Sequence, residues 1–448
     1  MDEQVVTMIN EMVAKARAAQ KEFESFSQEK TDEVVRAIGK VVYDRAEELA
    51  RMACEESGMG VYADKVAKCH GKSKCIWNSL KGKKSVGIIR VAKAKGVVGS
   101  VTPVTNPVVT PMCNAMFALK GQNAIIVAPH PRTQNVNKYV VDLFRAELAK
   151  LGAPVDLIQT VEKSSIDATN ALMQSVDVVV ATGGAGMVKS AYSSGKPALG
   201  VGPGNVQVIV DRGVELEEAI PKIISGRIFD NGIICSGEQC VLLPKESFDR
   251  AIDIFKQNHV FYVEDADTAK KFADAIFPDN GPINRRVVGQ SVQTIAALAG
   301  VEVPADTKMI LIKARSIGRG EPLCREKMCP VMITAAYDTF EDAVRMAQTD
   351  LDYEGKGHTA SLHSHDMEHI KYAGEKLTVS RLIVNQPSST GAGGSLYNGF
   401  APTTTLGCGS WGNNSISENL NYTHLINVSQ IGLYNKDAKI PTDKEIWN

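Results

Sequence analysis

The sequence has no excess of charge of either sign and no long apolar run. Its 50 basic side chains stand against 51 acidic ones, a formal charge of −1 at pH 7. A chain so balanced has no general field for nucleic acid or an anionic membrane, so local groups must hold any anionic ligand. No apolar run approaches the roughly 18 residues of a membrane span. Residues 1–20 also lack the apolar core and cleavage site of a signal peptide, so we expect a cytoplasmic protein without nucleic-acid or membrane partners.

Metal-binding patterns are also missing. The nine cysteines are odd in number and irregularly spaced, which argues against a disulfide framework and for a reducing compartment. The pairs in "CSGEQC" and "CREKMC" are five residues apart, which suits neither a CxxC redox site nor a zinc knuckle. His365 and His369 are four apart, but no HExxH pattern or third ligand accompanies them. We therefore expect no metal, with both histidines on a surface helix.

Short apolar runs alternate with helical stretches along most of the chain. A length of 448 residues favours two domains over one core. Residues 1–57 have the periodicity of two helices, the second starting near Ser27. From Gly96, and again after Cys235, apolar runs separated by helices predict parallel sheets covered on both faces. The expected fold class is α/β, with two doubly wound, Rossmann-like domains.

The segment "VVVATGGAGMVKS" reads as a strand, a glycine-rich turn and a helix. Thr182, Gly183 and Gly184 lie at this turn, where a phosphate can approach the backbone and the N-terminus of the helix. The segment is not a GxGxxG fingerprint, so a plain tight turn remains the alternative.

Two further strand ends carry polar side chains. In "TPVTNPVVTP", the amide of Asn106 is held between prolines and could donate to a developing oxyanion, or could cap the helix that follows. In "IVAPHPRTQN", His130 and Arg132 follow a strand, where a cation can meet a ribose phosphate or simply be solvated.

The segment "DNGIICSGEQC" contains the candidate nucleophile. Cys235 follows an Asn-Gly turn and precedes a Ser-Gly turn, so its thiol can lie beside backbone N–H donors. Cys240 begins an apolar strand and is expected to be inert. His358 stands in a Gly-flanked segment and could be functional, and the Gly- and Ser-rich stretch 385–415 has the composition of a site-lining loop.

In order, "TPVTNP", "IVAPHP", "ATGGAGMV", "GVGPGN", "DNGIICSGEQ" and "EKMCPV" resemble the aldehyde dehydrogenase superfamily in its CoA-acylating branch. The resemblance covers nearly the whole chain and implies the aldehyde dehydrogenase fold, two Rossmann-like domains and a small oligomerisation element. It implies a nucleophile at Cys235, an oxyanion donor at Asn106, a pyrophosphate turn at Thr182, Gly183 and Gly184, an adenosine contact at Pro129, and a nicotinamide-ribose carboxylate at Glu326.

One departure from hydrolytic members of the family is informative. They carry a water-activating Glu about 34 residues before the cysteine, and the aligned segment "GVGPGN" places Gly200 there. Without this base, a thioester on Cys235 survives until a better nucleophile, the thiol of coenzyme A, arrives. The expected cofactor is NAD or NADP, with Arg132 favouring NADP, and Gly200 is counted among the cofactor-site residues.

The resemblance is strongest to members that act on succinate semialdehyde. Ser388, Ser389 and Thr390 could form an anion nest for the substrate carboxylate, and His358 could line the CoA channel. The same nest would hold sulfoacetaldehyde, the nearest rival substrate, followed by acetaldehyde, propionaldehyde and other small uncharged aldehydes. A catalytically silent binding protein of the same fold is the alternative from another class.

The resemblance also suggests how the chain is divided. Residues 1–80 and 96–202 are expected to bind the dinucleotide, and residues 203–425 to form the catalytic domain. Residues 81–95 and 426–448 would form the oligomerisation segment. A short hairpin region at 81–95 favours a homodimer and leaves a dimer of dimers open.

Overall fold

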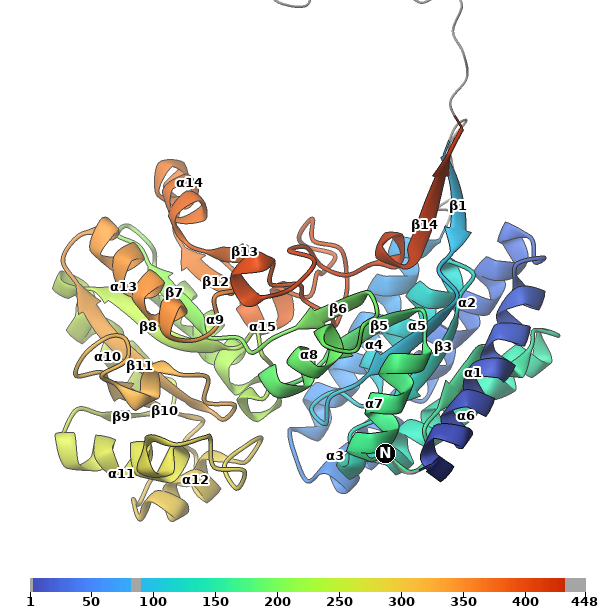
Figure 1. Cartoon of the computed structure of the whole chain (residues 1–448). Coiled ribbons are helices and arrows are strands. Elements are labelled where there is room, and N and C mark those ends of the chain that lie inside the picture. Colours follow the sequence, from blue (N-terminus) through green and yellow to red (C-terminus); the bar gives the residue numbers. More distant parts are fainter. Residues whose placement is uncertain (1–2, 82–89, 432–448) are drawn as a thin grey trace, which may run out of the picture.

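The computed structural model describes residues 3–81 and 90–431, and its first half is built on a parallel sheet of order β4-β3-β2-β5-β6 (Figure 1). The strands are β2 (Val97–Val101), β3 (Ala124–Ala128), β4 (Ile158–Thr160), β5 (Val178–Thr182) and β6 (Ala198–Val201). The helices are α1 (Glu3–Phe23), α2 (Gln28–Asp44), α3 (Ala46–Ser57), α4 (Tyr62–Leu80), α5 (Val109–Lys120), α6 (Gln134–Lys150), α7 (Ile166–Ser175) and α8 (Ala185–Tyr192). Every residue of β2 and β3 is buried, because helices cover both faces of the sheet.

The second half is built on a seven-stranded parallel sheet of order β13-β12-β7-β8-β11-β10-β9. Its strands are β7 (Val206–Val210), β8 (Glu238–Pro244), β9 (Val260–Val263), β10 (Met309–Lys313), β11 (Val331–Tyr337), β12 (Gly357–His363) and β13 (Val379–Val384). Its helices are α9 (Leu216–Ile228), α10 (Phe248–Gln257), α11 (Ala266–Ile276), α12 (Val292–Ala299), α13 (Phe340–Tyr353), α14 (Met367–Lys376) and α15 (Ser388–Gly391). Separate apolar cores pack on the two faces of this sheet, so the predicted α/β class with two doubly wound sheets is confirmed.

The strand order of the first sheet locates a binding crevice. In chain order its strands read 3-2-1-4-5, so the direction of winding reverses between β2 and β5. Ligands of such sheets bind at the carboxyl ends of the strands beside this reversal. Those ends lead into the Asn106 segment after β2 and the Thr182–Gly184 turn after β5, two of the segments predicted to be functional.

The N-terminal helices differ from the prediction in one respect. Ser27 caps α2 as expected, with its side chain accepting the N–H of Lys30. The chain leaves the helical conformation at Arg45, whose φ and ψ are −107° and 22°, so residues 3–57 form three helices and not two. A one-residue break leaves the apolar periodicity of the following turn almost in phase, and for this reason periodicity alone missed it.

The segment predicted to mediate oligomerisation is only partly described. β1 (Arg90–Ala94) pairs antiparallel with β14 (Ile426–Gln430) in a two-stranded sheet that projects from the body of the protein (Figure 1). Residues 82–89 and 432–448 lie outside the described residues. Within the described ranges, every helix is too short or too polar to cross a bilayer.

Candidate active site

Cys235 lies directly after a turn that the sequence favours. Asp230, Asn231 and Gly232 have positive φ angles of 53°, 52° and 68°, a conformation that Asp, Asn and Gly adopt most readily. The side chain of Cys235 packs against an apolar cluster that includes Val201 of β6. Since β6 belongs to the first sheet and β8 begins three residues after the cysteine, the thiol lies where the two halves meet.

Arg227 holds both ends of the segment that carries Cys235. Its guanidinium is fully buried and donates to the carbonyl of Gly232 at 2.9 Å, to that of Glu238 at 2.7 Å and to that of Cys329. Buried charge-assisted hydrogen bonds of this kind fix backbone geometry. Arg227 therefore holds the backbone of the segment that carries Cys235, the candidate nucleophile.

Gly204 allows the segment after β6 to lie directly against the cysteine. A Cβ atom at this position would be 1.8 Å from the carbonyl oxygen of Cys235 and 3.3 Å from Nδ1 of His358. No side chain fits in that space. The "GVGPGN" segment thus brings Cys235 and His358, two residues singled out from the sequence, to the same point.

Gly200, one of the predicted cofactor-site residues, packs against α8. A Cβ atom there would lie 2.9 Å from Cγ1 of Val188 and 3.0 Å from Cε2 of Tyr192, and the Gly200 N–H donates to the Tyr192 hydroxyl at 2.9 Å. Gly200 therefore faces α8. Because successive residues of a strand point to opposite faces, the side chain of Val201 points away from α8, and it belongs to the apolar cluster against which Cys235 packs.

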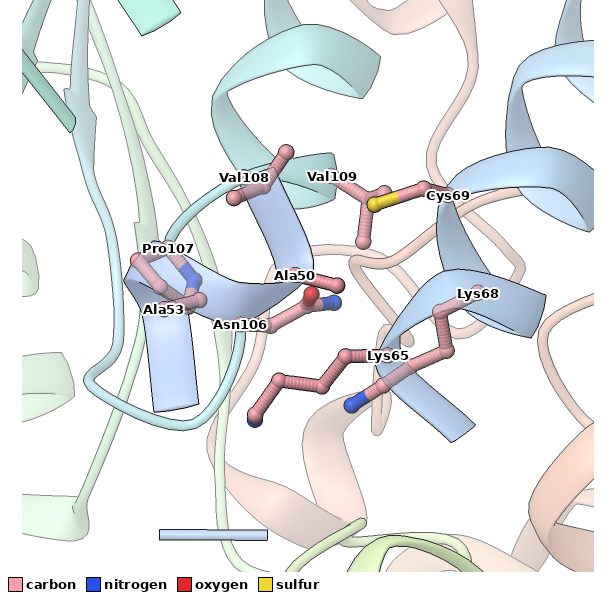
Figure 2. A pocket seen from close by; sticks show the side chains of 9 residues that line it. All are labelled: Ala50, Ala53, Lys65, Lys68, Cys69, Asn106, Pro107, Val108 and Val109. Carbon is pink, nitrogen blue, oxygen red and sulfur yellow. The ribbon is translucent and has the colours of Figure 1, made fainter. Parts of the chain in front are cut away.

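Asn106 is not a helix cap. α5 starts after Val108, and no side chain caps it. Asn106 instead shares a narrow pocket with Lys65 and Lys68 of α4, and Figure 2 shows its amide directed into the space between the loop and that helix. Among the described residues the amide has no hydrogen-bond partner, so it is free to donate to a ligand.

Glu326 adds a carboxyl group near the thiol. It accepts the N–H of Gly204, while its own N–H donates to Oε2 of Glu354 at 2.7 Å. Burial, reinforced by the charge of Glu354, raises the pKa of Glu326 to about 8. Burial, together with the charge of Glu326, also raises the pKa of the Cys235 thiol to about 12.

Arg381 supplies a buried positive charge that acts in the opposite direction. Its guanidinium donates to the carbonyls of His358 and Gly407 at 2.8 and 2.7 Å and to the hydroxyl of Thr359 at 3.2 Å. It also donates to the amide oxygen of Asn419 at 3.1 Å and to the carbonyl of Ser417 at 3.5 Å. All of these acceptors are uncharged, so its field is not cancelled by an ion pair. Arg381 lowers the pKa of the Cys235 thiol and stabilises any anion that forms there.

His358 is neutral and has one free ring nitrogen. It is fully buried, and burial together with Arg381 holds its pKa well below the ordinary value. Its Nδ1 lies 2.9 Å from the hydroxyl of Thr359, whereas its buried Nε2 has no hydrogen-bond partner among the described residues. Such an atom is a candidate contact for a ligand.

The predicted pyrophosphate turn is open. Gly184 is the N-cap of α8, and a Cβ atom there would have no neighbour within 4 Å. The hydroxyl of Thr182 lies 3.2 Å from that of Thr405. The free N–H groups at the start of α8 can therefore receive a phosphate, which fits a dinucleotide across the crevice.

The candidate adenosine end follows β3. Pro129 ends this strand region, and His130 and Arg132 are exposed beyond it. Burial, then Arg132 and Arg285, lowers the pKa of His130. The guanidinium of Arg132 donates to the carbonyl of Ser57, so one of its faces is already engaged.

The predicted anion nest already holds a carboxyl group of this chain. The N–H of Ser388 donates to Oε1 of Glu238 at 2.6 Å, and burial raises the pKa of Glu238 to about 7. The hydroxyls of Ser388 and Ser389 are buried and unpartnered within the described residues, while Thr390 is exposed. The first N–H of this short helix is therefore already bound, and the hydroxyls of Ser388 and Ser389 are the groups that can still contact a ligand.

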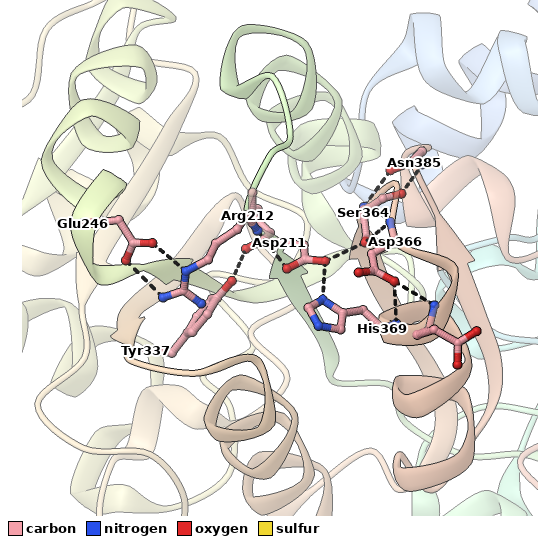
Figure 3. Close-up of polar contacts among 10 residues, drawn as sticks. Asp211, Arg212, Glu246, Tyr337, Ser364, Asp366, His369 and Asn385 are labelled. Carbon is pink, nitrogen blue, oxygen red and sulfur yellow. Dashed lines mark hydrogen bonds and ion pairs between the residues drawn. The ribbon is translucent and has the colours of Figure 1, made fainter.

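A Ser, His and Asp cluster elsewhere does not form a second nucleophilic site. Asp211, at the end of β7, accepts the hydroxyl of Ser364 at 2.6 Å and lies 2.7 Å from Nδ1 of His369 (Figure 3). Because the serine donates to the carboxylate and not to the imidazole, no base activates it. The cluster fixes α14 to the sheet. His365 lies in the turn before α14, not on the helix as predicted, and no cluster of metal-ligand type occurs among the described residues.

The sequence did not lead us to three residues of the site, namely Arg381, Arg227 and Lys65. Arg381 gave one usable signal, a lone charge inside the apolar strand "VSRLIV". Arg227 and Lys65 lie on helices, where a basic residue normally reads as solvated. Cys240 is 1% exposed within β8, as predicted.

Comparison with known proteins supports the family that the sequence motifs indicated. Residues 3–269 match the model of the aldehyde dehydrogenase family. The chain is 59% identical, over 98% of both chains, to the succinate-semialdehyde dehydrogenase (acetylating) of Clostridium kluyveri.

Solved structures agree as well. An acetylating aldehyde dehydrogenase from Geobacillus thermoglucosidasius superposes with a TM-score of 0.93 at 33% identity, covering 97% of this chain and 99% of that one. A propionaldehyde dehydrogenase from Rhodopseudomonas palustris with bound propionyl-CoA gives 0.85 at 29%, covering 94% and 93%. The chain therefore belongs to the aldehyde dehydrogenase family, in its NAD(P)-dependent, CoA-acylating branch.

Proposed function

We propose that this enzyme converts succinate semialdehyde, CoA and NAD(P)+ reversibly into succinyl-CoA and NAD(P)H. The observation that carries the acylating reaction is that Gly200 stands where hydrolytic relatives have a water-activating Glu, while the neighbouring Val201 contributes to the apolar cluster that packs against Cys235. Its 59% identity to an acylating succinate-semialdehyde dehydrogenase supports the substrate.

The reaction has two stages, and the first is the oxidation of the aldehyde on Cys235. The thiol of Cys235 releases its proton to solvent, which is the proton that the oxidation yields overall, and its sulfur adds to the aldehyde carbon. The amide of Asn106 donates to the resulting oxyanion. The field of Arg381 stabilises the anionic sulfur. NAD(P)+, when bound, accepts the hydride, and the carboxyl group of Glu326 is assigned to its ribose. What remains on Cys235 is a thioester.

The second stage transfers the acyl group. The sulfur of CoA attacks the thioester carbon, a new carbon–sulfur bond forms, and the Cys235 thiolate leaves. We assign Nε2 of His358 to a hydrogen bond with the CoA thiol. The buried hydroxyls of Ser388 and Ser389 are assigned to the lining of the same channel. Water is the weaker competitor because Gly200 stands where hydrolytic relatives have the water-activating carboxylate.

The decisive measurement is NAD(P)H formation from a panel of aldehydes with and without CoA. We expect strict dependence on CoA, succinyl-CoA as product and no succinate. Cys235→Ala should abolish the reaction, whereas Cys240→Ala, a matched change of the buried cysteine in β8, should retain it. Formation of succinate without CoA would refute the acylating reaction. Preference for sulfoacetaldehyde or propionaldehyde would refute only the substrate, and inactivity throughout would indicate a binding protein.

We further propose a preference for NADP. Its support is the pair of cations, Arg132 and Arg285, that both act on His130. Glu56 already accepts the N–H groups of Asn135 and Val136 at the start of α6, so a 2′-phosphate would depend on these cations. Arg132→Ala should raise the KM for NADP+ and leave that for NAD+ unchanged. Equal changes would remove Arg132 from cofactor recognition.

Assembly as a homodimer through β1 and β14 is also proposed. This sheet exposes the apolar side chains of Val428 (50%) and Val91 (42%), and Ile431, directly after β14, is 51% exposed. Exposed apolar surface of this kind can mark a contact with a partner. A cytoplasmic location is consistent with all nine cysteines being free thiols.

A further inference from the structure

One face of α4 carries lysines that point into the protein. Lys65, Lys68 and Lys72 follow the i, i+3, i+7 spacing of one helix face. The side chains of Lys65 and Lys68 are only 5% and 9% exposed, and Lys72 donates to the carbonyls of Gly393 and Gly394 at 2.6 and 3.2 Å. Lysine is almost never buried unless it is paired, so a row of three requires an explanation.

Two of these lysines share one partner. Nζ of Lys65 lies 3.3 Å from Oδ2 of Asp230, and Lys68 binds the same oxygen. Oδ1 of Asp230 accepts the N–H of Val61 at 2.7 Å. Asp64 is turned toward the backbone and accepts the N–H of Asp230 at 2.6 Å. Two ammonium groups therefore compete for one carboxylate oxygen, and each retains donors for another acceptor.

The same two lysines line the pocket of Asn106. Figure 2 shows the amide and both ammonium groups at the edge of one space, with Pro107, Val108 and Val109 as its apolar wall. A ligand there meets an amide donor on one side and two cations on the other.

The other basic and anion-binding groups near the site are already engaged. Lys72 is held by two carbonyls, and the N–H at the start of α15 is held by Glu238. Arg381 is surrounded by carbonyl and hydroxyl groups of its own chain. Lys65 and Lys68 are thus the cations that share a pocket with the oxyanion donor.

We propose that Lys65 and Lys68 bind the acidic group at the far end of the aldehyde substrate and so select a short aldehyde carrying a terminal carboxylate. This inference rests on the proposed function, since it assumes that the aldehyde carbonyl reaches Asn106. The selected group is a carboxylate held by charge-assisted hydrogen bonds. Asp230 keeps the two ammonium groups in place when the substrate is absent.

The test compares two four-carbon aldehydes, succinate semialdehyde and butyraldehyde, which differ in the terminal carboxylate. With saturating CoA and NADP+, Lys68→Met should raise the KM for succinate semialdehyde about 10- to 100-fold, the range expected for a lost hydrogen bond to a charged group. Its kcat for this substrate, and both constants for butyraldehyde, should change little. Lys74→Met, on the exposed face of the same helix, should leave all four constants unchanged.

A structural role predicts a different result. If Lys68 only held Asp230, Lys68→Met would reduce activity toward both aldehydes equally, and that outcome would overturn the proposal. Lys68→Arg retains the charge and should retain the preference. If Lys68→Met does not fold, Lys65→Met, which leaves Lys68 on Asp230, provides the same comparison. If the wild-type enzyme itself shows no preference for succinate semialdehyde over butyraldehyde, that result would instead contradict the substrate given in the proposed function.

Discussion

The thiol of Cys235 lies between two buried groups of opposite effect. Glu326 raises its pKa and Arg381 lowers it. With a pKa of about 12, little thiolate exists at neutral pH in the ligand-free protein. Reactivity at the residue scale therefore depends on groups that stabilise negative charge at the moment of attack, namely Asn106 and Arg381.

Removing the amide of Asn106 should affect chemistry and not cofactor binding. We expect Asn106→Ala to lower kcat by ~10²–10³, the usual cost of one lost oxyanion donor. The Kd for NADP+, measured by quenching of protein fluorescence, should stay the same because the predicted cofactor turn follows β5. Unchanged turnover would exclude Asn106 from the mechanism.

Ionisation of Glu326 should control cofactor affinity. Ribose hydroxyls donate to a carboxylate, but with a pKa of about 8 this group is mostly protonated below that pH. Affinity for NADP+ should therefore rise with pH up to about 8, by about tenfold per pH unit for one linked proton, and level off above it. Equilibrium titrations between pH 6 and 9 measure this dependence.

The matched variant for this prediction is Glu326→Gln. Because the amide does not titrate in this range, the affinity of the variant for NADP+ should be independent of pH. A wild-type affinity that does not change between pH 6 and 9 would show that Glu326 does not act through its ionised form.

At the scale of elements, the end of β6 and the cysteine segment form one unit. Gly204 lets the two backbones meet, and Arg227 at the end of α9 holds the cysteine segment from the other side. Neither residue contacts the thiol. The position of the nucleophile is thus set by how α9, β6 and β8 pack together.

Gly204→Ala should disrupt this unit. Its Cβ would lie 1.8 Å from a backbone oxygen that no side-chain rotation can move, so we expect a large loss of kcat and a destabilisation of at least about 1–3 kcal/mol, the range for forced overpacking. Gly202→Ala is the control, because a Cβ there has no neighbour within 4 Å. Thermal unfolding and steady-state kinetics compare the two. Equal behaviour of both variants would contradict the close approach at Gly204.

At the scale of the whole molecule, Asp230 joins the two halves. It belongs to the second half of the fold and binds Val61, Lys65 and Lys68 of the first half. These contacts are among those that connect the two halves. The active site lies on this junction, so its geometry is a property of the complete fold.

The β1–β14 sheet should determine the oligomeric state. Placing a charge at an exposed apolar position of this sheet, as in Val428→Lys, should dissociate the proposed dimer, since an unpaired buried charge is costly at an interface. Sedimentation velocity should then give a monomer mass, while Lys371→Glu on exposed α14 should leave the mass unchanged. A monomeric wild-type protein would refute the proposed assembly.

Local sequence determined much of this protein. The alternation of apolar runs and helices predicted both parallel sheets because strand and helix periods are properties of neighbouring residues. The Asp-Asn-Gly turn marked Cys235 because only such residues adopt positive φ angles readily, and the apolar strand after it marked Cys240 as inert. The family motifs added the roles expected for Asn106 and Glu326.

The tertiary structure decided what depends on residues far apart in the chain. It turned Gly200 toward α8 and Val201 into the apolar cluster that packs against Cys235, filled the expected anion nest with Glu238, and placed Lys65 and Lys68 beside Asn106. It also buried Arg381 among carbonyl groups near Cys235. Burial, charge pairing and side-chain direction are set by packing between segments that are not neighbours in the chain, and no local pattern encodes them.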